Sequence, residues 1–230
     1  KHHERAVIGP RRSHVQSRAA PLHPDPIERN RQLMGEIVGH WRLGKSFSRP
    51  SDSWMARTPD PDAVEQMETV IVNAKKEGDS VGGIVELIIS GVPAGLGDPV
   101  FSKLDARLSG ALCSLGAVKG FEIGDGFQCA SMKAGEFNDE MNGGEFLSNH
   151  AGGILGGIST GQDIKIRLAI KPTPSIFQAQ QTSDAYGNDH DIQIEGRHDP
   201  CIVPRIIPVI ESMTSLVILD AREIQKRLVD

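Results

Sequence analysis

One segment of this 230-residue chain largely dictates its own secondary structure. In residues 164–171, isoleucine or leucine stands at every second position, and the positions between hold Lys165, Arg167, Ala169 and Lys171. Successive side chains of a β-strand point to opposite faces of a sheet, so this alternation predicts a strand. We expect one face of that strand to pack in a core and the other face to be cationic.

Three segments have the apolar spacing of helices. Residues 61–77 begin after Asp60, a capping carboxylate, with Pro61 at the first helical position, and Gly78 supplies a stop. Apolar residues three or four positions apart predict a second helix around residues 104–112 and a long closing helix over residues 206–228.

Further strands are expected between these helices. Residues 81–92 and 117–123 have the composition of buried strands. The turn Gly124-Asp125-Gly126 followed by strand-like residues 127–132 is typical of a hairpin. Helices mixed with antiparallel strands predict the α+β class.

The charge of the chain divides it into two parts. Residues 1–56 hold ten Lys or Arg against five Asp or Glu, and residues 57–230 hold fifteen against twenty-five, which gives the overall net charge of −5. The first part is rich in proline, and only residues 27–41 have any helical periodicity. We therefore interpret residues 1–56 as a basic, largely irregular leader and residues 57–230 as the folded core.

Several classes of function are disfavoured by composition. No apolar run reaches the roughly eighteen residues of a membrane span, and no signal peptide opens the chain, which predicts a soluble, cytoplasmic protein. The basic residues of the leader are interspersed and the chain has one Tyr and two Trp, which argues against a nucleic-acid partner.

The cysteines and histidines do not have the spacing of a metal site. Cys113, Cys129 and Cys201 are odd in number and far apart, which predicts three reduced thiols. The histidines of the leader lie on no regular element, so a tag remnant or a solvated arm is favoured over a metal site; they are His2, His3, His14 and His23.

A glycine-rich stretch, Asn149 to Gly161, is the first candidate for chemistry. Its two Gly-Gly pairs, 152–153 and 156–157, leave backbone N–H groups without shielding side chains, which suits close approach to a phosphate or a flat ring. The stretch matches neither the P-loop nor the dinucleotide fingerprint. From the residues alone, a packing or turn role is an equal alternative.

Lys171-Pro-Thr-Pro-Ser175 follows the alternating strand. The prolines fix an extended backbone, and Lys171, Thr173 and Ser175 offer one charge and two hydroxyl groups that together would clamp an anion. A simple exit from the strand is the alternative.

Gly196-Arg-His-Asp-Pro-Cys201 places a guanidinium, an imidazole and a carboxylate in succession. Arg197 can bind a phosphate or carboxylate, and Asp199 can accept a proton. In an extended chain Arg197 and Asp199 face one side and His198 the other. A surface turn joined by an Arg–Asp pair is the alternative interpretation.

Taken together and in this order, these motifs resemble those of the chorismate synthase family. The resemblance runs from about Pro59 to Asp220. It rests on Lys76-Glu-Gly-Asp-Ser80, Gly91-Val-Pro-Ala-Gly-Leu-Gly97, Ala117-Val-Lys-Gly120, Gly124-Asp-Gly-Phe127, the Asn149 to Gly161 stretch, Lys171-Pro-Thr173 and Gly196-Arg-His-Asp-Pro-Cys201.

The resemblance implies a fold and a reaction. The family has a β-α-β sandwich with internal pseudo-symmetry, assembled as a homotetramer. It converts 5-enolpyruvylshikimate 3-phosphate to chorismate, in the shikimate route to the aromatic amino acids, by a 1,4-elimination of phosphate that requires reduced FMN. Bifunctional members also reduce their flavin with NADPH.

The resemblance also assigns site residues. Asp199 matches a carboxylate proposed to remove or relay the proton. The expected flavin contacts are Gly116, Ala117, Gly156, Lys171, Pro172, Thr173, Pro174, Ser175 and Arg197. Gly116 departs from the family, which usually has Asn there, so flavin binding is expected to lose about one hydrogen bond.

The family's N-terminal motifs have no counterpart in residues 1–56. These include a Gly-Glu-Ser-His-Gly start, a second catalytic histidine and an Arg-Ser-Ser-Ala-Arg-Glu stretch, and we expect a member without its N-terminal third. Two hypotheses follow: a flavin-dependent phosphate lyase, or an inactive flavin- or phosphate-binding fragment whose role is oligomer assembly. A third is a core left incompletely folded, with stranded hydrophobic faces.

Overall fold

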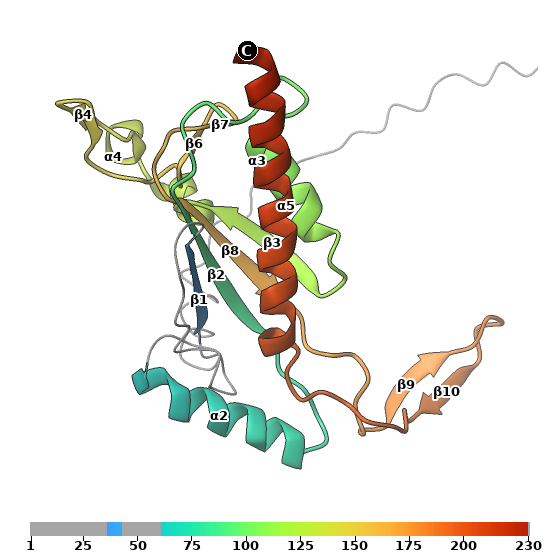
Figure 1. Ribbon diagram of the computed structural model, residues 1–230. Helices are drawn as coiled ribbons and strands as arrows, with labels where there is room; N and C mark the ends of the chain where they lie inside the picture. The colour runs from blue at the N-terminus through green and yellow to red at the C-terminus, as the bar shows by residue number, and fades with distance from the viewer. Residues whose placement is uncertain (1–35, 43–60, 230) are drawn as a thin grey trace, which may run out of the picture.

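A four-stranded sheet forms the centre of the computed structural model, which describes residues 36–42 and 61–229 (Figure 1). Its strands are β1 (Glu36–Arg42), β2 (Gly83–Ser90), β8 (Ile164–Ile170) and β3 (Val118–Ile123), in that order across the sheet. β1 is parallel to β2, and β8 is antiparallel to both β2 and β3.

Three larger helices accompany the sheet. They are α2 (Pro61–Lys76), α3 (Leu104–Cys113) and the long α5 (Val203–Val229). Figure 1 shows α3 and α5 side by side on one face of the sheet. α3 and α5 thus form a helix layer on that face of the sheet, and the mixture of helices with antiparallel strands confirms the α+β class.

Short elements complete the fold outside the main sheet. A 3-10 helix, η2 (Gly126–Ser131), and α4 (Ala134–Phe137) precede the hairpin of β4 (Met141–Asn142) and β5 (Glu145–Phe146). A second hairpin pairs β6 (Ile154–Leu155) with β7 (Ile158–Ser159). A third, β9 (Gln180–Ser183) with β10 (Asp189–Ile192), extends away from the core with all eight strand residues exposed.

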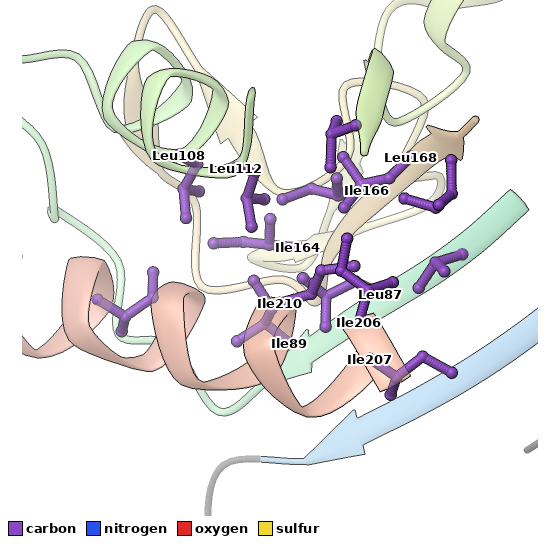
Figure 2. Close-up of a cluster of buried hydrophobic side chains, with 14 of the residues drawn as sticks. Leu87, Ile89, Leu108, Leu112, Ile164, Ile166, Leu168, Ile206, Ile207 and Ile210 are labelled. Atoms are coloured by element: carbon purple, nitrogen blue, oxygen red, sulfur yellow. The ribbon is translucent and has the colours of Figure 1, made fainter. Parts of the chain in front are cut away.

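The alternation of residues 164–171 has the predicted consequence in β8. Ile164, Ile166, Leu168 and Ile170 are buried, whereas Lys165 is exposed and Arg167 is half-buried on the opposite face. The buried face meets leucines of α3 and isoleucines of α5, as Figure 2 shows for Leu108, Leu112 and Ile210. Each such buried side chain contributes about 1.5–3 kcal/mol relative to an exposed one, so the packing of this face stabilises the fold.

The structure confirms the predicted positions of the helices, with small shifts at their ends. α2 ends at Lys76, one residue before the expected end, and α3 extends one residue further to Cys113. α5 begins at Val203 and not at Ile206, because Val203 is fully buried and adds another apolar contact to the first turn. It continues through Pro208 inside the helix.

The predicted hairpin strand at residues 127–132 is wrong. Gly126–Ser131 form a 3-10 helix with no buried side chain, and Gln128 N–H donates to the carbonyl of Asp125 at 3.0 Å. The partner expected for this strand, β3, pairs with β8 instead. The segment instead satisfies its backbone locally, since Met132 N–H also donates to the carbonyl of Cys129 at 3.1 Å.

The helical periodicity of residues 27–41 is also not matched by the structure where it is described. Residues 36–42 form β1, whose backbone pairs with all of residues 84–90 in β2. Pairing with a buried strand satisfies these backbone groups and overrides a weak local helical pattern. The rest of the leader, including His2, His3, His14 and His23, lies outside the described residues.

Candidate functional site

Three of the predicted motifs meet at one end of the sheet. β8 ends at Ile170, opposite Gly83 at the start of β2 and Val118 at the start of β3. The Lys171–Ser175 run therefore emerges beside both strands. Lys171 N–H donates to the carbonyl of Ala117 at 2.9 Å, which joins the run to the segment before β3.

The turn between α2 and β2 shapes the Lys171–Ser175 run. Ser80 is buried, and its hydroxyl donates to the carbonyl of Thr173 at 2.7 Å. The backbone of Gly82 lies so close to that of Ile170 that a Cβ added at Gly82 would stand 2.2 Å from the carbonyl oxygen of Ile170. Only glycine permits this approach of the two backbones, so the turn and the run are fitted to each other.

The Gly196–Cys201 loop is held against the same turn. Val81 N–H donates to the carbonyl of Pro200 at 2.8 Å, and Val81 forms an isolated parallel bridge with Cys201. The ring of His198 lies edge-on to that of Phe177, with centroids 4.6 Å apart. The structure thus places Arg197 and Asp199 near the Lys171–Ser175 run.

The side chains of this loop alternate as predicted. Asp199 makes two ion pairs, with Arg205 Nη1 at 2.8 Å and with Arg197 Nη2 at 3.8 Å. His198 is directed elsewhere, with Nε2 2.9 Å from the carbonyl oxygen of Ile194. Both interpretations of the motif are therefore present: an Arg–Asp pair joins the turn, and an exposed guanidinium is available beside a carboxylate.

Several features at this end, which we call the Lys171 end, suit an anionic ligand. Lys171 is half-buried, and the side chain of Arg197 is 77% exposed. Thr173 Oγ1 is buried, yet it has no hydrogen-bond partner among the described residues. Buried polar atoms are normally paired, so this hydroxyl is a candidate ligand contact.

Gly116 and Cys201 are the remaining predicted positions at this end. Gly116 is exposed, and an added Cβ would meet nothing within 4 Å. The Cys201 thiol is buried, and burial raises its pKa, so it is poorly suited to act as a nucleophile. Cys113 and Cys129 are exposed free thiols.

Gly156 lies at the opposite end of the sheet, which we call the Gly156 end. It forms the β6–β7 turn with Gly157, at φ 61° and 87°, as a two-residue hairpin turn of this kind requires. Leu104 N–H donates to the carbonyl of Gly157, and Gly124 N–H to that of Lys165 near the start of β8. Since β8 rises about 3.3 Å per residue, the two ends are about 20 Å apart along the strand.

A carboxylate cluster at the Gly156 end was not predicted from the sequence. Asp139 accepts hydrogen bonds from Ser148 Oγ (2.7 Å), from His150 N–H (2.7 Å) and from Ala151 N–H (3.0 Å). Burial acts to raise the pKa of Asp139, but these hydrogen bonds outweigh it and lower the pKa below its ordinary value. His150 Nδ1 lies 2.6 Å from Asp125 Oδ2.

An open, apolar pocket of about 430 Å³ adjoins this cluster. Phe121, Phe127 and Phe137 line it together with Ile154 and Leu155 of β6. Within the described residues no cluster of His, Cys, Asp or Glu has the arrangement of a metal site, and no helix there is long and apolar enough to cross a membrane.

Known proteins resemble this chain over most of its length. The family model of chorismate synthase matches residues 27–222, beginning thirty residues before the expected boundary at residue 57. Chorismate synthase of Porphyromonas gingivalis is 56% identical over 170 residues, which cover 72% of this chain and 46% of that protein. Chorismate synthase of Methanosarcina acetivorans is 57% identical over 169 residues, covering 71% and 46%.

A solved structure agrees with these sequence matches. A crystal structure of chorismate synthase superposes with a TM-score of 0.60 and 31% identity, covering 74% of this chain and 46% of that one. The chain spans about half the length of the curated relatives it matches. By sequence and by fold, this chain belongs to the chorismate synthase family.

Proposed function

We propose that this chain carries the flavin-binding part of a chorismate synthase, a carbon–oxygen lyase that eliminates phosphate from 5-enolpyruvylshikimate 3-phosphate to give chorismate with reduced FMN. The observation that carries this proposal is the convergence of Ala117, the Lys171–Ser175 run and the Arg197–Asp199 loop at one end of the sheet. These segments are far apart in sequence, and all contain residues that the family resemblance assigns to the flavin or to proton transfer.

The residues at the Lys171 end fit a phosphorylated flavin. Lys171 and Arg197 supply positive charge for a phosphate, and Thr173 Oγ1 is a buried hydroxyl without a protein partner among the described residues. Exposed Gly116 leaves open space beside Ala117, where a flat ring can approach the backbone. Reduced FMN, when bound, supplies electron density to the allylic system from which phosphate leaves.

In this proposal the chain's own residues bind and orient the cofactor and the substrate, and one of them accepts a proton. Pro172 and Pro174 hold the run extended, so that Thr173 and Ser175 present their hydroxyls at fixed positions. Lys171 and Arg197 bind the anionic groups of cofactor and substrate. Asp199 receives the proton lost in the 1,4-elimination at one of its carboxylate oxygens.

Gly156 is assigned to the flavin by resemblance alone. It lies at the opposite end of the sheet from Lys171, and β8 between the two ends is about 20 Å long, so the contact requires either a ligand that extends along the sheet or a second copy of the chain. We place a homotetramer, a cytoplasmic location and, for a bifunctional form, NADPH in the same proposal, on the family resemblance. The division of the chain at residue 57 also stays a prediction.

Two measurements on the purified chain test this function. Titration of FMN, followed by quenching of flavin fluorescence, measures binding, and an anaerobic assay with reduced FMN and 5-enolpyruvylshikimate 3-phosphate measures chorismate by its absorbance. We expect saturable FMN binding, and chorismate formation would show that the chain is an active lyase. Binding without turnover would favour the inactive fragment, and absence of binding would overturn both.

Lys171→Gln is the informative variant, and Lys165→Gln is its matched control. Both lysines belong to the same alternating segment, but Lys165 lies near the opposite end of β8. Loss of one charge-assisted hydrogen bond, about 1.5–3 kcal/mol, predicts at least a tenfold weaker FMN affinity for Lys171→Gln. Equal affinities of the two variants would contradict the placement of the phosphate site.

A further inference from the structure

Asp199 lies between two arginines that hold it unequally. Arg205 Nη1 donates a hydrogen bond to Asp199 Oδ2 at 2.8 Å. Arg197 Nη2 is 3.8 Å from Asp199 Oδ1, which is beyond hydrogen-bond distance. The carboxylate is therefore bound through one oxygen to Arg205, while its other oxygen faces Arg197 without a direct bond.

The backbone of Arg205 is held more rigidly than that of Arg197. Arg205 lies in the first turn of α5, near Val203 and Ile206, both buried in the core, and its N–H donates to the carbonyl of Ile202. Arg197 belongs to the loop before the helix and has a side chain that is 77% exposed. A carboxylate paired with Arg205 is thus attached to the rigid part of the fold.

The position of Arg205 is unfavourable without its partner. The N-terminus of a helix carries a partial positive charge, so a cation in the first turn is repelled, and this first turn contains no acidic residue. The Asp199 carboxylate, four residues before the helix begins, offsets both the charge of Arg205 and the partial positive charge of the helix N-terminus. The Arg205–Asp199 ion pair is partly exposed and adds little to the free energy of unfolding. Its main effect is therefore to orient the Asp199 carboxylate.

We infer that Arg205 is a positioning residue that holds Asp199 through Oδ2 and so keeps Arg197 free to bind an anion. Without Arg205, Arg197 is the one ion-pair partner left to Asp199 among the described residues, and a bidentate pair with Arg197 would occupy the guanidinium N–H donors that a phosphate or carboxylate needs. Arg205 also leaves Oδ1 of Asp199 as the oxygen available to accept a proton. The link to catalysis rests on the proposed function, whereas the pairing itself does not.

The pairing is tested without any ligand by chemical modification of arginine. The 230-residue chain is treated with p-hydroxyphenylglyoxal, and the rate at Arg197 is followed by mass spectrometry, with exposed Arg222 of α5 as the internal reference. In Arg205→Gln we expect Arg197 to react about two- to fivefold more slowly, the factor that corresponds to a partly exposed ion pair. The rate at Arg222 stays unchanged.

Two further variants separate positioning from a general structural effect. Arg205→Lys keeps a donor for Asp199 Oδ2 and is expected to retain most of the wild-type rate at Arg197. Asp199→Asn introduced into Arg205→Gln removes the competing carboxylate and is expected to restore the rate. An unchanged or faster rate in Arg205→Gln, or no restoration in the double variant, overturns the inference.

FMN titration of the same variants connects the inference to the proposed function. We expect Arg205→Gln to weaken FMN binding by the same factor and the double variant to recover it, whereas Arg222→Gln has no effect. If the wild-type chain binds no FMN, the proposed function fails, and the arginine modification rates still decide whether Arg205 positions Asp199.

Discussion

At the scale of single residues, the Lys171 end is built from side chains of segments that are far apart in the sequence. The resemblance named Lys171, Thr173, Arg197 and Asp199, and the structure brings their segments together. Arg205 was missed because the closing helix was expected to begin at Ile206, one residue later. A basic residue in a first turn with no acidic residue is a signal that would have pointed to it.

Gly82 gives the first residue-scale prediction. In Gly82→Ala the new Cβ would stand 2.2 Å from the Ile170 carbonyl, so the Lys171–Ser175 run must move away. We expect FMN affinity to fall by about tenfold or more, equivalent to about 1.4 kcal/mol, and stability to fall by about 1–3 kcal/mol. Fluorescence titration measures the first and urea unfolding the second.

Gly110→Ala is the control for this substitution. Gly110 lies within α3, where an added Cβ meets nothing within 4 Å. Exchange of a helical glycine for alanine is expected to stabilise the protein by about 0.5–1 kcal/mol and to leave FMN affinity unchanged. If Gly82→Ala bound FMN as tightly as Gly110→Ala, the close approach would be irrelevant to the site.

Asp139 gives a pH-dependent prediction. Because its pKa is lowered in the folded state, its stabilising effect is complete above the ordinary value of 3.8 and is lost as the pH falls through the lowered value. Asp139→Asn should lower the free energy of unfolding by about 1–2 kcal/mol at pH 7, after allowance for partial exposure. This difference from wild type should shrink as the pH falls below about 4.

Urea unfolding at a series of pH values measures this difference. The exposed neighbour Glu140, changed to Gln, serves as the control for removing one negative charge. A difference between wild type and Asp139→Asn that stayed constant down to pH 2 would show that the three hydrogen bonds do not depend on the ionised carboxylate.

At the scale of elements, strong periodicity was reliable and weak patterns were not. The alternation of residues 164–171 predicted β8 and its buried face, since exchanging the faces would have buried Lys165. Residues 127–132 also have apolar and aromatic residues, but they form a 3-10 helix with no buried side chain, and β3 pairs with β8, a strand about forty residues later in the sequence. Which strands pair is decided by contacts remote in sequence, and local composition does not contain them.

Thr214 in α5 provides an element-scale prediction. Its side chain is fully buried, and Oγ1 has no hydrogen-bond partner among the described residues. Thr214→Val keeps the shape and removes an unpaired polar group, so we expect the free energy of unfolding to rise by about 1 kcal/mol. A lower thermal midpoint in Thr214→Val would indicate that the hydroxyl is hydrogen-bonded after all.

Ser212→Ala in the same helix is the matched control. The Ser212 hydroxyl is exposed and donates to the carbonyl of Pro208 at 2.7 Å. Its removal is expected to change stability by no more than about 0.5 kcal/mol, as is usual for surface positions. Thr214→Val and Ser212→Ala together separate the effect of burying a hydroxyl from the effect of its hydrogen bond within one helix.

At the scale of the whole molecule, one core joins the sheet to α3 and α5. Ile166 is fully buried at its centre, opposite Leu87 of β2 and Ile123 of β3. Ile166→Ala should destabilise the protein by about 2–5 kcal/mol, because the helices cannot close the cavity fully. Amide exchange in α3 and α5 should accelerate together, since both rest on this layer.

Lys165→Ala, on the opposite face of the same strand, is the whole-molecule control. Lys165 is exposed, and its change is expected to cost no more than about 0.5 kcal/mol. Faster exchange in only one of the two helices of Ile166→Ala would show that α3 and α5 are separate cooperative units.

The sequence by itself determined the family, the α+β class and the faces of its strongest elements. These properties depend on local periodicity and on motifs in a fixed order, which a linear chain displays directly. Only the tertiary structure decided that Gly156 and Lys171 lie at opposite ends of β8, and that Arg205 binds Asp199. Strand direction and sheet order set these distances, and both arise from pairing between remote segments whose free energy no single segment contains.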